Sequence, residues 1–525
     1  MMIETSANSH ITSPAMFKNR QVNTRLRRSV LLPGAYQLVY FGILLLISLC
    51  PASLRAQKVP RFEPSDSAII DLPENQKISF GYLIVYEDRL KGDKTLRLPV
   101  FILKSRSARP KEDPILYTSG GPGSSSVNTA KYGEYYSYLD DRDFIVFEQR
   151  GTRYAQPNLS CPELDSIKRS NTWITLKQSE REVMQAEAAM RCQKRLISGG
   201  SNLSTYNTKE IAEDIEDLRK VLGIKRLNLY TVSYSTKIAQ VLLRDHPGSI
   251  RSAVLDSPLP LWANYDETSL NFFHEKLNLL FSLCKSDSAC NTAYPRLKER
   301  FLTFLRQANR KPVAVPLKSP IDSSLITVSL KGYEIASFID LGDTYNLKNV
   351  PRLLHALCKG DYEVLKPFIY NLFYSDSRAM GMRLSVWCSE EYPFENLSAP
   401  TKTTAILAPY RQMKSSAVPL SLCKIWKVER AKEIENKPFT TKVPVLLVNG
   451  ELDPDTPASW GQELQRRFSN SYHFIFKGMS HTPTQYWDNN CGMQLAQSFF
   501  NDPLKRPLVK CFEQLKGITI VTKSR

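Results

Sequence analysis

The feature that most constrains the fold of this chain is an alternation of strand and helix patterns that stops once and later resumes. Before the interruption, the predicted elements are a helix at 208–222, a strand at 226–232, a helix to about 246 and a strand at 251–257. After it, they are a strand at 443–450, a helix around 457–468, a strand at 472–477 and a helix near 491–501. This alternation predicts a mostly parallel sheet covered by helices on both faces.

The intervening segment shows helical patterns without regular alternation, and we expect it to form a helical cap. Upstream of the alternation, further strands are predicted at 78–88, 96–105, 113–119 and 143–152. The expected domains are a leader at 1–56, the first part of an α/β core at 57–257, the cap at 258–440 and the C-terminal part of the core at 441–525.

The leader has the order of a signal peptide. A positive start is followed by an apolar run from Leu38 to Leu49 and a small-residue end at Ala56, and Met16 is an alternative start. The run is short for a membrane span, so we expect cleavage near Ala56 and a secreted or periplasmic protein without a stable span. An uncleaved anchor is the rival, and a lipid anchor on Cys50 is disfavoured because the residue before it is large.

Cysteine content and charge narrow the class of protein further. None of the ten cysteines lies in a CxxC pair, which favours disulfides in an oxidising compartment, and we expect neither a metal nor a cofactor. The net charge is +18, of which the leader carries +5 because it has six basic residues and one acidic residue. The remaining basic residues are dispersed, so we expect a solvated basic surface and no nucleic-acid partner.

Ser233 stands at the turn between a predicted strand and the helix that follows it. A serine hydroxyl is a weak nucleophile that needs a histidine base, and the base needs an orienting carboxylate. Of the six histidines, His481 follows the last predicted strand in a loop, where a parallel sheet presents functional groups. The carboxylate is expected to be Asp453, directly after the strand at 443–450, with Glu451 and Asp455 as close rivals.

The reaction also needs hydrogen-bond donors for an oxyanion. The segment SGGPGSSS follows the strand at 113–119, and the expected donors are the amides of Gly121 and Tyr234. A structural serine, a glycine-rich turn and a loop histidine are each common without any catalytic role. Their joint order in loops that follow strands, with serine first, then aspartate and histidine, is typical of a serine hydrolase.

Together these segments resemble the tripeptidyl-aminopeptidase-like and proline-iminopeptidase-like serine peptidases of the α/β-hydrolase superfamily. The matching segments are GGPGSS (120–125), EQRGTRYAQPNLSCPE (148–163), VSYST (232–236), VWCSE (386–390), GELDPDTP (450–457) and GMSH (478–481). The resemblance implies the α/β-hydrolase fold with a helical cap insertion, a Ser233–His481–Asp453 triad, and an exported exopeptidase that acts on the free N-termini of peptides.

The chain departs from the family pattern at four positions. Thr231 and Ser235 replace the usual glycines around the serine, Glu148 replaces an aspartate, and Ser119 stands where iminopeptidases often have histidine. The turn needs small residues because strand and helix cross closely there. Since all three catalytic residue types are retained, we predict a working nucleophile. A carboxylesterase with the same triad and a binding protein on a catalytically weak scaffold are the alternatives.

An aminopeptidase must recognise the α-ammonium group of its substrate, and a carboxylate in a partly dry pocket is the direct means. The candidates are Glu390, Glu391 and Glu148, and Glu390 is favoured because it aligns with an acidic position of the family's cysteine motif. A solvated acidic loop is an equal alternative.

Sequence neighbours and the resemblance suggest the disulfides Cys161–Cys192, Cys284–Cys290, Cys388–Cys423 and Cys491–Cys511, which leaves Cys358 as a free thiol.

Overall fold

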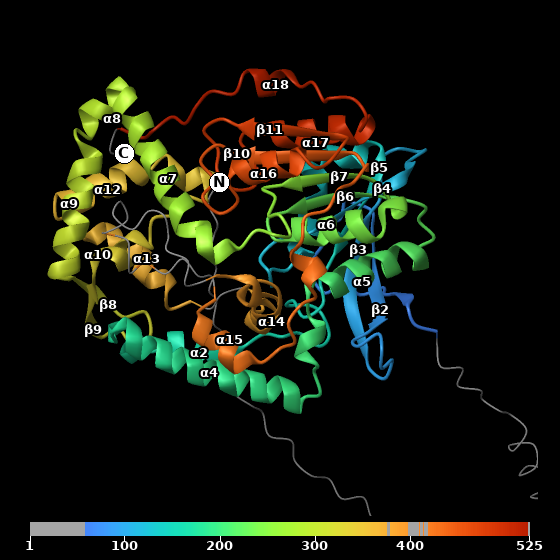
Figure 1. The fold of residues 1–525 in the computed structure, drawn as a ribbon, viewed down its shortest axis with the longest axis horizontal. Coiled ribbons are helices and arrows are strands. Elements are labelled where there is room, and N and C mark those ends of the chain that lie inside the picture. Colours follow the sequence, from blue (N-terminus) through green and yellow to red (C-terminus); the bar gives the residue numbers. More distant parts are fainter. Residues whose placement is uncertain (1–57, 375–377, 397–408, 410–412, 414–417, 523–525) are drawn as a thin grey trace, which may run out of the picture. The chain divides into compact units, whose positions relative to one another are not determined.

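A nine-stranded sheet organises the described part of this computed structural model, which comprises residues 58–374, 378–396, 409, 413 and 418–522 (Figure 1). Its strands are β1 (Arg61–Pro64), β2 (Ile78–Tyr86), β3 (Thr95–Leu103), β4 (Lys111–Thr118), β5 (Arg142–Phe147), β6 (Leu227–Val232), β7 (Ile250–Asp256), β10 (Val445–Gly450) and β11 (Ser471–Phe476). The expected leader lies outside the described residues.

The order of the strands across the sheet is β1-β2-β3-β5-β4-β6-β7-β10-β11. The pairs β1–β2, β2–β3 and β3–β5 are antiparallel, and all pairs from β5–β4 to β10–β11 are parallel. The predicted fold class is therefore confirmed. Because the strands that carry the candidate residues are parallel, their C-terminal ends meet at one edge of the sheet.

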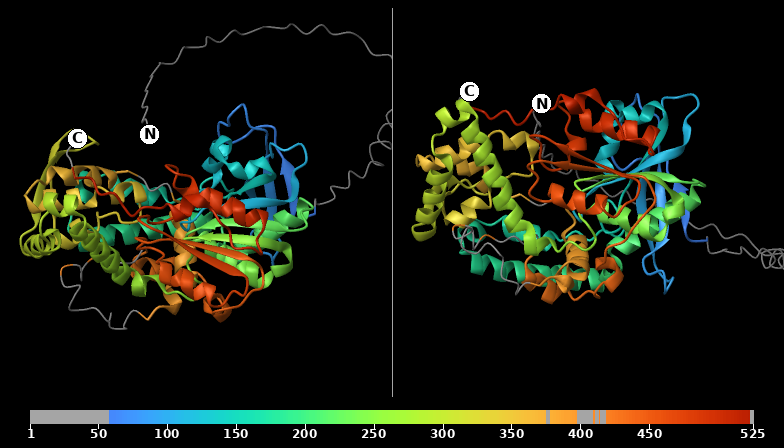
Figure 2. Two further views of the ribbon diagram at one scale, coloured as in Figure 1. Left: turned by 90° about the horizontal axis from the view of Figure 1, so that it is seen from above. Right: turned by 45° about the horizontal axis from the view of Figure 1, so that its top comes forward.

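Helices cover both faces of the sheet (Figures 1 and 2). Along β2, Leu83 and Val85 belong to the apolar cluster that includes α5 (Thr208–Val221) and α6 (Ser235–Asp245). The alternate residue Ile84 belongs to a second cluster that includes α17 (Cys491–Asn501). This period of two is what a strand with two buried faces requires.

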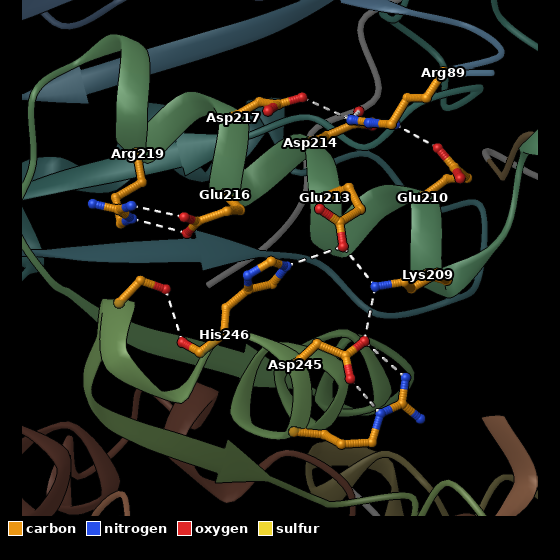
Figure 3. Close-up of polar contacts among 12 residues, drawn as sticks. Arg89, Lys209, Glu210, Glu213, Asp214, Glu216, Asp217, Arg219, Asp245 and His246 are labelled. Atoms are coloured by element: carbon orange, nitrogen blue, oxygen red, sulfur yellow. Dashed lines mark hydrogen bonds and ion pairs between the residues drawn. The ribbon is translucent and has the colours of Figure 1, made fainter. Parts of the chain in front are cut away.

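Ion pairs add to the apolar packing of α5 (Figure 3). Arg89, from the turn after β2, contacts Asp214 (2.6 Å) on this helix, and the fully buried Asp214 also binds Arg150 (2.7 Å). Glu213 accepts a hydrogen bond from the Nε2 atom of His246, just after α6 (3.0 Å). Helix α5 is thus held between the β2–β3 hairpin and the helix that follows Ser233.

The cap segment is mostly helical but also contains a small sheet. Its helices are α7 (Tyr265–Ser286), α8 (Ser288–Ala293), α9 (Leu297–Arg310), α10 (Gly332–Ala336), α11 (Thr344–Leu347), α12 (Val350–Cys358), α13 (Lys366–Asn371), α14 (Met380–Glu390) and α15 (Leu420–Trp426). The strands β8 (Val313–Lys318) and β9 (Leu325–Leu330) form an antiparallel pair that was not expected. The strand signal was present, since Val313, Val315 and Leu317 are buried and alternate with exposed residues.

Three helices that precede residue 208 were also not expected. They are α2 (Pro162–Lys168), α3 (Asn171–Thr175) and α4 (Gln178–Ser198). The Nε2 atom of Gln193 on α4 donates to the carbonyls of Ile425 (2.8 Å) and Trp426 (2.7 Å) on α15. Residues assigned from the sequence to the core therefore pack against a cap helix, as Figure 1 also shows.

Four disulfides link the described residues: Cys161–Cys192, Cys284–Cys290, Cys388–Cys423 and Cys491–Cys511. These are the pairs that the resemblance implied. Cys358 is a half-buried free thiol at the end of α12. Among the helices that the structure describes, none is both long enough and apolar enough to cross a membrane.

Candidate active site

Ser233 occupies the sharp turn between β6 and α6. Its backbone is left-handed (φ +55°), a conformation that is strained for a residue with a side chain and that persists only where the surroundings hold it. The Ser233 amide donates to the carbonyl of Asp256 at the end of β7 (2.9 Å), and the amide of Thr236 donates back to the Ser233 carbonyl (2.9 Å). These contacts fix the serine at the C-terminal edge of the sheet.

The two positions at which the family has glycine accommodate their side chains. Thr231 is buried in β6, and its hydroxyl donates to a backbone carbonyl of β7 (3.3 Å). Ser235 is also buried, and its hydroxyl donates to the carbonyl of Thr118 on β4 (2.8 Å). The tightest approach lies instead at Gly120, where a Cβ atom would be 2.9 Å from the Cβ atom of Ser233. Thr231 and Ser235, in place of glycine, are thus compatible with the sharp turn at Ser233.

Asp453 orients the ring of His481. The Nδ1 atom of His481 lies 2.8 Å from Oδ2 of Asp453, which is completely buried. The amides of Asp455 (2.8 Å) and Thr456 (3.0 Å) donate to the other carboxylate oxygen. Although burial alone would raise the pKa of Asp453, His481 and the amide and hydroxyl of Thr456 lower it below its usual value. Asp453 therefore stays ionised beside the imidazole.

Three carboxyl groups surround His481. Burial alone lowers the pKa of this histidine, but Asp453, Asp455 and Asp256 raise it to about 9. Asp256 was missed in the sequence, where nothing distinguishes it from other aspartates at strand ends. Its carboxylate accepts a hydrogen bond from the amide of Thr484 in the loop that follows His481 (2.9 Å), and burial raises its pKa to about 7.

A cavity of about 270 Å³, which we call the acyl cavity, brings most of the predicted residues together. Ser233 and His481 both line it, as do the expected oxyanion residues Gly121 and Tyr234. Tyr234 directly precedes α6, whose N-terminal end carries partial positive charge that favours a developing anion. The predicted nucleophile, the predicted base and the two residues whose amides are the expected donors therefore line one cavity.

Residues 119–126 (SGGPGSSS), which we call the oxyanion loop, are held by one side chain from the core and one from the cap. Gly121 has φ +123°, and the Nη1 atom of Arg383 on α14 donates to its carbonyl (2.8 Å). Glu148 accepts hydrogen bonds from the amide of Ser126 (2.7 Å) and the hydroxyl of Ser125 (3.0 Å). Glu148 does not line the acyl cavity, although the sequence made it a candidate for the substrate ammonium. Its carboxylate positions the oxyanion loop.

The two adjacent glutamates at the end of α14 face different surroundings. Glu390 is buried, and its carboxylate accepts hydrogen bonds from the amide and the hydroxyl of Thr208 at the start of α5. The Thr208 hydroxyl in turn contacts the hydroxyl of Tyr234 (2.9 Å). Glu390 does not line the acyl cavity, although the sequence favoured it over Glu391 as the partner of the substrate ammonium. It ties the cap to the turn that carries Ser233.

Glu391 lines the acyl cavity. One of its oxygens pairs with Lys237 of α6, and both side chains are almost completely buried. The other oxygen, Oε2, is buried and has no hydrogen-bond partner among the described residues. The sequence contained a signal for this pair, because Lys237 interrupts a helix segment in which residues 235–243 are all buried.

Two groups of side chains among the described residues gather three potential metal ligands. In the first, both cysteines of the set Cys161, Glu163 and Cys192 are joined in a disulfide, which leaves no thiolate. In the second, Asp453, Asp455 and His481, the Nδ1 atom of the histidine is already engaged by Asp453. The donor chemistry of the second set matches a hydrogen-bonded acid–base pair.

Comparison with known proteins gives two matching family models. One, described as the alpha/beta hydrolase fold, matches residues 113–294, and the other, described as TAP-like protein, matches residues 408–508. The tripeptidyl aminopeptidase of Streptomyces coelicolor is 24% identical over 429 residues, covering 75% of each chain. The serine protease Hip1 of Mycobacterium bovis is 21% identical over 75% of this chain and 79% of its own. A solved alpha/beta hydrolase fold protein from Chitinophaga pinensis is 11% identical, with a TM-score of 0.34 over 85% of this chain and 98% of its own.

Proposed function

This chain belongs to the TAP-like family of α/β-hydrolases and is a serine hydrolase, and on that premise we propose that it is an exported aminopeptidase. It cleaves peptide bonds near free N-termini through Ser233, His481 and Asp453. The observation that carries the proposal is the oxygen of Glu391 that is buried in the acyl cavity without a partner among the described residues. A substrate α-ammonium group is a chemically matched partner for that oxygen.

In the proposed acylation step, Oγ of Ser233 attacks the substrate carbonyl carbon while His481 takes the hydroxyl proton. The amides of Gly121 and Tyr234 donate to the resulting oxyanion. His481 then gives the proton to the leaving nitrogen, the C–N bond breaks, and the acyl group stays on Ser233. A water molecule, deprotonated by the same histidine, releases the acyl group. The contact between His481 and Asp453 (2.8 Å) supports this assignment.

The proposed recognition of the N-terminus uses the Glu391–Lys237 pair. Lys237 balances one carboxylate oxygen, which makes it possible to keep a charged glutamate in a dry cavity before substrate binds. The second oxygen then accepts a hydrogen bond from the substrate ammonium. A desolvated ion pair of this kind contributes about 2–5 kcal/mol to discrimination against a blocked terminus.

Export is proposed from the leader and is supported by four disulfides, which persist in oxidising compartments. We retain the proposed division into a leader at 1–56, a core at 57–257 and 441–525, and a cap at 258–440. The contacts of α4 with α15 add residues 178–198 to the surface on which the cap rests.

The decisive experiment compares one good peptide substrate with its N-acetylated form. We expect acetylation to lower kcat/KM by about two orders of magnitude, because it removes the charge that Glu391 receives. Labelling of Ser233 by a small fluorophosphonate serves as a control, since this reagent needs the triad but no N-terminus. Equal rates on both peptides, with labelling intact, contradict the aminopeptidase and favour an endopeptidase or an esterase.

A further inference from the structure

Exposed aromatic rings gather next to the loop that follows His481. The ring of Trp487 lies 6.3 Å from that of Tyr132 and 6.2 Å from that of Tyr135, and its amide donates to the hydroxyl of Tyr345 (3.0 Å). These four side chains remain 38–59% exposed. We call them the aromatic surface. Contiguous exposed aromatic side chains mark binding sites more often than solvated surface.

A second cavity, of about 360 Å³, joins the aromatic surface to His481. Tyr345 of the aromatic surface lines it, together with Tyr486, whose ring is 4.6 Å from that of Tyr345. His481 and Asp455 line both this cavity and the acyl cavity. Ser233 lines the acyl cavity but not the second cavity. The histidine thus stands between the two cavities.

The proposed reaction decides which part of a substrate each cavity receives. The acyl part must lie with Ser233 and the oxyanion donors, and its N-terminus reaches Glu391 in the acyl cavity. The leaving nitrogen takes its proton from His481, so the chain beyond the scissile bond departs on the histidine side. An enzyme that cuts near an N-terminus leaves most of the peptide on that side.

The negative charge that lines the second cavity is complementary to the positive charge of the leaving fragment. Asp340, Asp343 and Asp455 line it, and no lysine or arginine of the described chain is part of this lining. When the C–N bond breaks, the leaving fragment gains a new amine, which becomes an ammonium group in neutral water. An acidic lining is complementary to that group.

We propose that the second cavity and the aromatic surface form the binding site for the leaving segment of the peptide substrate. The residue after the scissile bond occupies the cavity beside His481, and the apolar side chains that follow pack on Tyr345, Trp487, Tyr132 and Tyr135. This inference rests on the proposed function and assigns its substrates as peptides that extend several residues beyond the cleaved bond.

The test uses substrates with one common N-terminal part and three leaving groups: p-nitroaniline, a five-residue segment of glycine and serine, and a five-residue segment that includes leucine and phenylalanine. We expect the apolar segment to give a kcat/KM at least about tenfold above that of the glycine–serine segment, since it buries apolar surface on the rings. Trp487→Ala should lower this ratio about tenfold. Tyr374→Ala, which removes a 63% exposed ring elsewhere, should leave the ratio unchanged.

A binding measurement complements the ratio. The free apolar leaving segment should inhibit competitively. Trp487→Ala should raise its inhibition constant by the same factor by which it lowers the ratio of kcat/KM between the apolar and the glycine–serine segment. If Trp487→Ala fails to fold, Tyr135→Ala carries the same test, because Tyr135 is the most exposed ring of the four (59%).

The outcomes separate this inference from the proposed function. A wild-type enzyme that prefers free N-termini but shows the same kcat/KM for both five-residue segments overturns the leaving-segment site and leaves the aminopeptidase intact. A ratio that neither ring substitution changes also overturns it. Loss of the preference for free N-termini contradicts the proposed function, and the inference falls with it.

Discussion

The acyl cavity has a half built by the sheet and a half built by the cap, and the two halves fix their side chains differently. Ser233, Asp453 and His481 all follow strands that end at one edge of the sheet. The cap half comes largely from α14, in which residues 381–390 are all buried. Neighbouring residues there face different partners, as Glu390 and Glu391 do. In the sheet half, the role of a residue can be inferred from its order along the chain. In the cap half, it depends on which side of the buried helix α14 the residue lies.

The largest effect is expected in the sheet half. Ser233→Ala should lower kcat by about four orders of magnitude or more, because it removes the proposed nucleophile and little volume. Ser235→Gly, two residues away, is the matched control and should retain activity within about tenfold. Turnover and thermal melting of both purified variants check this. A Ser233→Ala enzyme with near wild-type turnover contradicts the triad.

The next effect tests the cap half directly through its two glutamates. Glu391→Gln should remove most of the discrimination between free and acetylated N-termini, about two orders of magnitude in the ratio of kcat/KM values. Glu390→Gln should keep that discrimination, because its carboxylate contacts Thr208 and does not line the cavity. The opposite result would reverse the assignment of the two residues.

Glu390 should instead affect stability in a pH-dependent way. Burial raises its pKa from 4.5 to about 7, so the folded protein binds the proton more tightly than the unfolded chain. Its contribution is fully present below about pH 4.5 and is lost as the pH rises through 7. Between pH 5 and pH 8, the free energy of unfolding should fall by about 2 kcal/mol more in the wild type than in Glu390→Gln. Urea titrations at both values measure this difference, and identical pH dependence would contradict it.

The smallest expected effect is a shift of the pH profile. Since the pKa of His481 lies at about 9, the neutral base is populated on the alkaline side, and kcat/KM should rise with pH towards that value. Asp455→Asn removes one negative charge that raises this pKa, so the rising limb should move to lower pH by about half a unit to one unit. Asp66→Asn, at an exposed carboxyl that lines neither cavity, is the control, and an unshifted limb in Asp455→Asn would show that Asp455 does not act on the histidine.

The sheet half was predictable from sequence because each candidate follows a strand whose pattern is clear. The helix near 491–501 was predicted with the bounds observed for α17, and the strand before Ser233, predicted at 226–232, begins one residue later at Leu227. The cap half was not predictable, since two adjacent glutamates are equivalent in sequence until the helix that carries them is packed. Likewise, α4 lies early in the chain but packs against α15, and only the tertiary fold reveals that contact.

The pairing of β7 with β10 has a consequence for how the protein is made. Residues 253–256 pair with residues 445–448, so the ribosome completes the whole cap before this pairing can begin. Until then, β7 is an open edge with unpaired backbone groups, which favours association with other chains. Pairing across so large an insertion is also slow. We therefore expect chains that terminate before residue 445 to aggregate through the open edge of β7 although they contain Ser233.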